Sequence, residues 1–162
     1  MATVDHLRFA LMLFAALGCG IMAGVFFAFS GFVMNALSCL PPTQGIAAMQ
    51  SINVAVINPL FGLAFFGTAV ACVLLTVYSL LMWHKPGALY LLGGSLLYLV
   101  GTILVTMLLH VPQNDALADV DPASPDSAGL WYGYVASWTT WNHVRTTAAL
   151  VATASFTIAL CS

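Results

Sequence analysis

Four long apolar stretches constrain this chain more than any other feature of its sequence. They cover about residues 7–37, 60–83, 88–110 and 132–160. A helix of roughly 20 mainly apolar residues crosses the hydrocarbon core of a bilayer. With 62% hydrophobic and 5% charged residues, the chain has too few polar side chains to solvate a soluble fold. The sequence predicts an all-α integral membrane protein, a four-helix bundle with residues 1–162 in a single transmembrane domain.

The connection between the first two stretches predicts a short additional helix. Pro41-Pro42 interrupts the first helix, and Thr43 is suited to cap a helix that continues through Ile52. This segment carries no charge, so we expect it to lie at the membrane interface. Asn58 stands before Pro59, a residue that suits the first turn of a helix. Asn58 is therefore either the cap of the second helix or a side chain that faces a site.

The sparse charges predict the orientation of the bundle. Arg8 and Lys85 lie on the side that holds both termini, and basic residues favour the cytoplasm. We expect Val111-Pro112 to end the third helix, so that residues 111–131 form an acidic loop outside a bacterial inner membrane. The chain has only three basic residues, which excludes the electrostatic footprint of a nucleic-acid-binding protein.

Three polar side chains stand together near the start of the fourth stretch. Asn142, His143 and Arg145 precede fifteen residues that contain no charge. An ionised side chain inside a membrane costs a few kcal/mol, so it usually has a partner or a task. Arg145 lies about 22 Å from the inner end of its helix at 1.5 Å per residue, and His110 comes to the same outer end. The polar residues are therefore expected to converge there.

Helical spacing sorts these residues into faces. Trp138, Trp141, Asn142 and Arg145 recur at spacings of three and four, so they share one face of the fourth helix. Thr102, Thr106 and His110 likewise share one face of the third helix. His143 is turned roughly 100° from Asn142 and is expected to face a different neighbour.

Metal binding is an alternative that the spacing does not favour. His110 and His143 have no carboxylate or thiolate close by in the sequence. Catalytic zinc usually has three protein ligands, and non-haem iron has two His and a carboxylate. The sequence predicts no cofactor, and a metal or haem held by these two His residues remains the alternative.

Four stretches of the chain resemble, in order, the anthrone oxygenase-like membrane proteins. The stretches are Gly24-Val25-Phe26-Phe27-Ala28-Phe29-Ser30 with Phe32-Val33-Met34, Met49-Gln50-Ser51-Ile52-Asn53 to Asn58-Pro59, Val111-Pro112 with Asn114, and Trp138-Thr139 with Trp141-Asn142-His143-Val144-Arg145-Thr146. The resemblance implies oxidation of anthrones to anthraquinones by molecular oxygen without an evident cofactor. The chain departs from the family pattern at Asn35, where a proline is expected, and at His110, where an asparagine is more usual.

The residues permit the chemistry that this resemblance implies. Removal of an acidic methylene proton from an anthrone gives an enolate that reduces oxygen, so the protein would supply a base and stabilise an anion. We expect His143 to be the base, Arg145 to hold the oxyanion and Asn142 to donate a hydrogen bond. The residues expected to contact the substrate are Trp138, Trp141, His110, Asn114, Asn58 and Asn53.

Two other functions remain open from the sequence. The Asn142, His143 and Arg145 side chains can instead form a polar network that holds the helices of an accessory or structural protein together. A small transporter is the third hypothesis, and a chain of this length would need to form a homo-oligomer to build a pathway. The expected partners in every case include the lipid bilayer, and the enzyme hypothesis adds a hydrophobic small-molecule substrate.

Overall fold

A computed structural model describes residues 2–162, and this part of the chain is helical and contains no strand. The first segment consists of α1 (Ala2–Ala28), η1 (Phe29–Val33) and α2 (Met34–Ser38), and α3 (Pro42–Ala55) follows it. The next segment consists of α4 (Pro59–Gly62), η2 (Leu63–Gly67) and α5 (Thr68–Leu81). The following segment consists of α6 (Ala88–Tyr98), η3 (Leu99–Leu104), η4 (Thr106–His110) and α7 (Val111–Ala118). The last segment is the single helix α8 (Ser127–Leu160). The η elements are π-helical turns that continue the helices around them.

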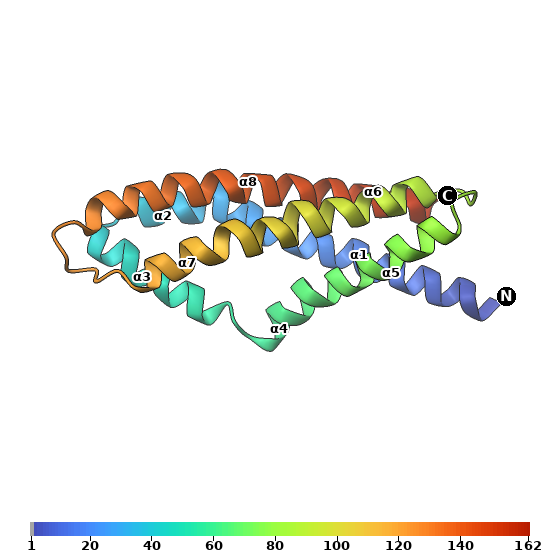
Figure 1. Ribbon diagram of the computed structural model, residues 1–162, viewed down its shortest axis with the longest axis horizontal. Coiled ribbons are helices and arrows are strands. Elements are labelled where there is room, and N and C mark those ends of the chain that lie inside the picture. The colour runs from blue at the N-terminus through green and yellow to red at the C-terminus, as the bar shows by residue number, and fades with distance from the viewer. Residues whose placement is uncertain (1) are drawn as a thin grey trace.

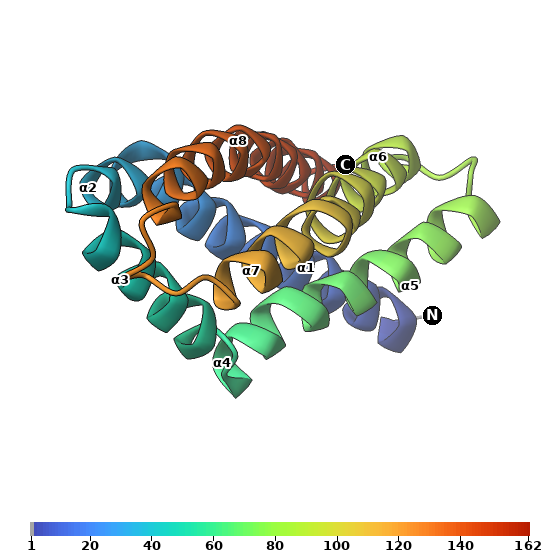
Figure 2. The ribbon, with the colours of Figure 1, turned by 60° about the vertical axis from the view of Figure 1, so that its left-hand side comes forward.

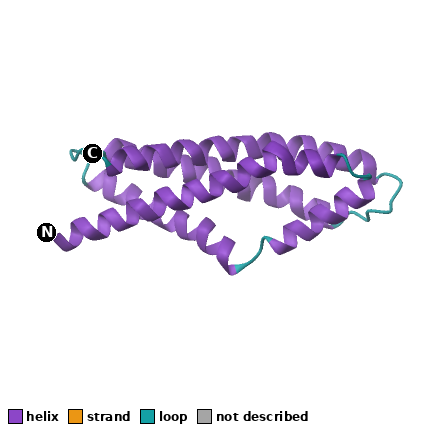
Figure 3. Cartoon of the chain, turned by 180° about the vertical axis from the view of Figure 1, so that it is seen from behind, coloured by secondary structure: helices purple, strands orange, loops and turns teal. Residues whose placement is uncertain are grey.

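The long segments run side by side along the molecule. Both termini and the turn between α5 and α6 lie at one end, whereas α2, α3 and the loop before α8 lie at the other (Figure 1; the same arrangement from behind in Figure 3). α8 packs against both α1 and α6, and α5 also contacts both α1 and α6, which closes the ring. α3 crosses the far end and contacts α2, α7 and α8 (Figure 2).

Three of the segments are long and apolar enough to cross a membrane. They are His6–Ser38, Pro59–Leu81 and Ala88–Ala118. Large apolar side chains point outward from them, for example Leu60 and Leu81, which are more than 70% exposed. An apolar surface of this extent is unfavourable in water, so these helices indicate a membrane protein. The fourth long helix, α8, contains the polar residues Asn142, His143 and Arg145.

The third predicted helix does not end at His110. It continues through Pro112 to Ala118, and α8 begins at Ser127 rather than near residue 132. The predicted acidic loop 111–131 is therefore wrong at both ends, and only residues 119–126 connect the two helices. Pro112 is accommodated because the π-helical turn η4 stands directly before α7, and the Gln113 Nε2 donates to the Leu109 carbonyl oxygen over 2.9 Å.

The short helix after Pro41 is confirmed. α3 covers Pro42–Ala55, although Pro41 occupies the N-cap position that we predicted for Thr43 and makes no side-chain cap bond. Of the two alternatives for Asn58, the structure shows the helix cap, since Asn58 Oδ1 accepts a hydrogen bond of 3.0 Å from the Phe61 amide.

The interior has two apolar clusters with a polar layer between them. One cluster includes Met22, Tyr98 and Phe156 and lies in the half of the bundle that holds both termini. The other includes Met34, Met49 and Trp131 and lies beside α3. The polar residues occupy positions between these clusters on three of the long segments. They are Ser30 on η1, Thr102 on η3, Thr106 and His110 on η4, and Asn142 and Arg145 on α8.

Candidate functional site

Arg145 is the centre of the polar layer. Its side chain is 6% exposed, and its guanidinium donates from Nη2 to Asn142 Oδ1 over 2.6 Å and from Nη1 to Thr106 Oγ1 over 3.1 Å. The guanidinium carbon also lies 4.3 Å from the centre of the Phe26 ring and 5.2 Å from that of Trp138. Two neutral oxygens and two aromatic faces therefore surround the cation.

No carboxylate is among the groups that the structure records around Arg145. Four of the five acidic residues of the chain lie between positions 115 and 126, and the fifth is Asp5. An arginine side chain stays protonated in proteins, and cation–π contacts offset only part of the cost of burying its charge. The polar layer thus carries a net positive charge inside an apolar bundle.

Asn142 joins α8 to the first segment. Its side chain is fully buried, and Nδ2 donates to the Phe26 carbonyl oxygen over 2.7 Å and to Ser30 Oγ over 2.6 Å. Both amide atoms of Asn142 are consequently occupied, because its Oδ1 accepts from Arg145. The orientation of the amide follows from these partners, since only the nitrogen can donate.

His110 stands beside this pair with free hydrogen-bonding capacity. It is 1% exposed, and its ring meets that of Trp138 edge-on at a centroid distance of 5.0 Å. Neither ring nitrogen makes a hydrogen bond of good geometry, although the backbones of Val105 and Trp138 lie beside the ring, and Thr102 Oγ1 and Arg145 Nε likewise have no partner. A buried polar group without a partner costs about 1–3 kcal/mol, so native proteins contain few of them. Several such groups in one polar layer mark it as a candidate functional site.

Asn114 fixes the position of Trp138. Its Oδ1 accepts from Trp138 Nε1 over 3.1 Å and from the Tyr134 hydroxyl over 2.9 Å. The Asn53 side chain also lies beside that hydroxyl. Trp138 therefore has a fixed ring plane that contacts both Arg145 and His110. A cavity of about 290 Å³, between α7 and α8, borders this region through Tyr134.

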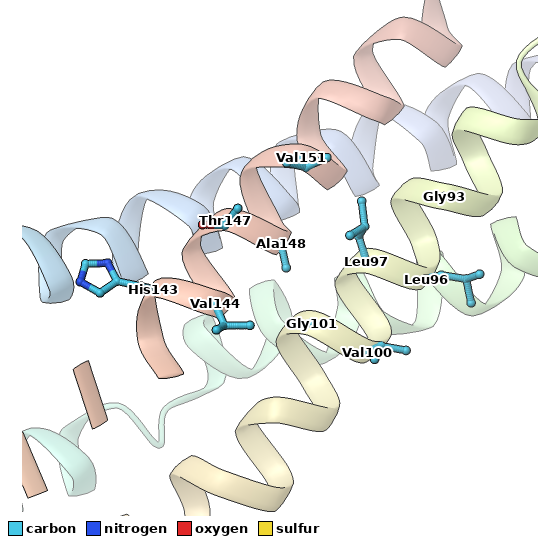
Figure 4. A pocket seen from close by; sticks show the side chains of 10 residues that line it. All are labelled: Gly93, Leu96, Leu97, Val100, Gly101, His143, Val144, Thr147, Ala148 and Val151. Atoms are coloured by element: carbon cyan, nitrogen blue, oxygen red, sulfur yellow. The ribbon is translucent and has the colours of Figure 1, made fainter. Parts of the chain in front are cut away.

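The structure does not bring every expected residue into this layer. His143 is exposed, Trp141 is 38% exposed, and Asn58 is an exposed helix cap. His143 is at one end of an open, apolar groove of about 650 Å³ between α6 and α8, and its ring points away from the side chain of Val144 (Figure 4). The expected catalytic triplet is thus divided between the two sides of α8.

The two histidines considered as metal ligands are separated in the same way, since His110 is buried and His143 is exposed. Within residues 2–162, no group of three or more His, Cys, Asp or Glu side chains lies close enough together to hold a metal ion.

Sequence reasoning missed two residues of the site. Thr106 receives a hydrogen bond from Arg145, and its signal was its spacing of four residues from both Thr102 and His110 on one helix face. Ser30 receives a hydrogen bond from Asn142 and had no signal beyond its place in a matching stretch. A hydroxyl that contacts a distant helix cannot be recognised from the periodicity of its own helix.

A known protein family matches this chain over more than half of its length. No curated protein and no solved structure matches it. The family described as anthrone oxygenase matches residues 59–155, which include α4 to α7 and most of α8. The matched region contains Thr106, His110, Trp138, Asn142 and Arg145. Since the match covers more than half of the sequence, the chain belongs to the anthrone oxygenase family.

Proposed function

We propose that this protein is a membrane-embedded oxygenase that oxidises a flat, hydrophobic, anthrone-like substrate with molecular oxygen. In this proposal the four long helical segments span the bilayer as a bundle, with both termini in the cytoplasm. Family membership and the three apolar helices support this function. The substrate is itself apolar, so it would reach the site from the lipid.

The observation that carries the proposal is the unpaired charge of Arg145. A preorganised cation in a water-poor site stabilises negative charge that develops during a reaction, and such stabilisation often contributes more to catalysis than any other single effect. Asn142 and Thr106 hold the guanidinium in place without neutralising it. An enolate oxygen supplies the missing negative charge, and the planar guanidinium is suited to hold it.

The overall reaction balances without an added reductant. Loss of one methylene proton from the anthrone gives an enolate, which transfers electrons to oxygen. One oxygen atom forms the new carbonyl at the former methylene carbon, and the other leaves as water with the two methylene hydrogens. The protein has to bind a flat ring, accept a proton and hold an oxyanion. Trp138 is suited to stack on the ring and Arg145 to hold the oxyanion.

Oxygen uptake tests this function. The purified protein in lipid nanodiscs is supplied with a simple anthrone, and uptake and anthraquinone formation are followed together. The expected result is one oxygen molecule consumed per anthraquinone, with label from ¹⁸O₂ in the new carbonyl. A rate equal to that of protein-free nanodiscs would contradict the proposal.

A structural role is the second candidate function. The Arg145 and Asn142 hydrogen bonds connect α8 to η1 and η4, so they also join separate helices. Polar contacts between membrane helices contribute about 0.6 kcal/mol each on average. If this were their whole function, substitution of Arg145 would lower stability and no substrate would be oxidised by the unchanged protein.

A further inference from the structure

We propose that His110 is the residue that accepts the methylene proton of the substrate. This inference rests on the proposed function, since it assigns one step of that reaction. It replaces the expectation for His143, whose side chain is exposed and points away from the apolar groove that it borders.

The free nitrogens of His110 and its position beside the Trp138 ring support this role. The imidazole is 1% exposed, and neither nitrogen is engaged in a hydrogen bond. A neutral imidazole carries one nitrogen with a lone pair, which accepts a proton without any other bond having to break first. Histidine is also the side chain that most often acts as a general base in enzymes.

The other groups around Arg145 do not suit this step. Arg145 is a permanent cation, and the amide of Asn142 is occupied by three hydrogen bonds. Thr106 donates its hydroxyl proton to the Thr102 carbonyl oxygen and accepts from Arg145. Among the side chains that contact the guanidinium or the Trp138 ring, His110 is therefore the one with a basic atom to spare.

The position of His110 also fits the geometry that the substrate requires. In an anthrone, the carbonyl and the methylene occupy opposite corners of the central ring. The oxyanion holder and the base must therefore be two different residues that border the same ring. His110 and Arg145 both pack against the Trp138 indole, at 5.0 Å between ring centres and 5.2 Å from the guanidinium carbon. In this proposal the substrate ring lies against Trp138, where His110 and Arg145 would both border it.

The step moves one proton and one electron pair. The C–H bond of the methylene breaks and an N–H bond forms on the imidazole, which becomes positively charged. The electron pair of the C–H bond is delocalised into the ring system and onto the carbonyl oxygen, where Arg145 holds it. No oxidant takes part, so the step can be observed in the absence of oxygen.

Anaerobic deuterium exchange isolates this step. The protein in nanodiscs is incubated in D₂O with an anthrone, and deuterium entry at the methylene is followed by mass spectrometry. We expect His110→Gln to slow the catalysed exchange roughly 100-fold, the lower end of what a general base contributes. His84→Gln, at an exposed turn residue, is the matched control and should exchange at the wild-type rate. Exchange that survives in His110→Gln, or that is lost in His143→Gln alone, overturns the assignment.

A second measurement uses the unchanged protein and does not depend on the folding of a variant. With ¹⁵N-labelled histidine, anaerobic addition of the anthrone should convert one buried imidazole to the doubly protonated form as the enolate absorbance appears. Enolate formation with every buried imidazole still neutral would contradict the inference. If the wild-type protein shows neither exchange nor oxygen uptake, the proposed function fails, whereas exchange and uptake that do not need His110 overturn this inference alone.

Discussion

Arg145 and Asn142 are joined by a hydrogen bond of 2.6 Å between Nη2 and Oδ1, one helical turn apart on α8. Because the amide nitrogen of Asn142 donates to Phe26 and Ser30, the amide cannot turn away from the guanidinium without breaking bonds to the first segment. The cation is thus oriented by neutral groups and keeps its full charge. A carboxylate in an ordinary ion pair would neutralise the guanidinium. These neutral partners instead leave its positive charge available to an anion.

Substitution of Asn142 should weaken the fold more than substitution of its partner Ser30. Asn142→Leu removes the oxygen that accepts from Arg145 and both amide donations, so we expect a loss of about 2 kcal/mol in the free energy of unfolding. Ser30→Ala removes one of two acceptors and should cost about 0.6 kcal/mol. Unfolding in mixed detergent micelles measures both, and equal losses would contradict the central place given to Asn142.

The effects of substituting Asn114 and Tyr134 on the free energy of unfolding are predicted not to be additive. Asn114→Leu leaves the Tyr134 hydroxyl and the Trp138 indole without their common acceptor, at a cost of about 1–3 kcal/mol for each unsatisfied group. Adding Tyr134→Phe removes one of the two unsatisfied donors. The double variant should therefore be more stable than Asn114→Leu alone, as a double-mutant cycle of unfolding free energies would show. Strictly additive losses would indicate that the two side chains do not share this bond.

Gly45 is predicted to be required by the packing of α3. A Cβ at this position would lie 2.8 Å from Trp131 Cζ2 and 3.0 Å from the Leu37 carbonyl oxygen. Gly45→Ala should therefore cost about 1–3 kcal/mol of stability, as overpacking usually does. Gly129 on α8 has no atom within 4 Å of its ideal Cβ, so Gly129→Ala should be stabilising by up to about 1 kcal/mol. Thermal unfolding distinguishes the two, and a stable Gly45→Ala variant would contradict the close contact.

Two native cysteines provide a test of orientation. Cys39 and Cys161 are exposed, while Cys19 and Cys72 are buried. Cys39 directly follows α2 and Cys161 directly follows α8, at opposite ends of the molecule (Figure 1). If both termini are cytoplasmic, a membrane-impermeant maleimide added to intact bacterial spheroplasts should label Cys39 and spare Cys161. The reverse pattern would invert the proposed topology.

The sequence predicted the long helices well because their signal is local. Apolar runs longer than 20 residues and the breaker Pro41-Pro42 are properties of neighbouring residues. The end of the third helix was missed because Pro112 is tolerated through a π-helical turn and a bond from Gln113. Neither compensation is visible in a count of helix breakers.

The site was predicted in part, for a related reason. Helical spacing placed Trp138, Trp141, Asn142 and Arg145 on one face and His143 on another. The structure agrees with this division except at Trp141, which is 38% exposed whereas the other three side chains of that face are buried. Helical spacing could not show which of the two histidines lies beside Arg145, because His110 comes from a different helix. Contacts between helices depend on rotation and depth, and periodicity within one helix determines neither.

The central claim is that the charge of Arg145 is kept for an anion formed during the reaction. Oxygen uptake with an anthrone, compared between Arg145→Gln and the wild type in nanodiscs, tests it most directly. Arg8→Gln is the matched control, because Arg8 donates to the Tyr78 hydroxyl near the other end of the bundle. We predict that Arg145→Gln, where it folds, loses at least about 100-fold in rate, whereas Arg8→Gln keeps its rate. Full oxygen uptake by a folded Arg145→Gln variant would contradict the claim.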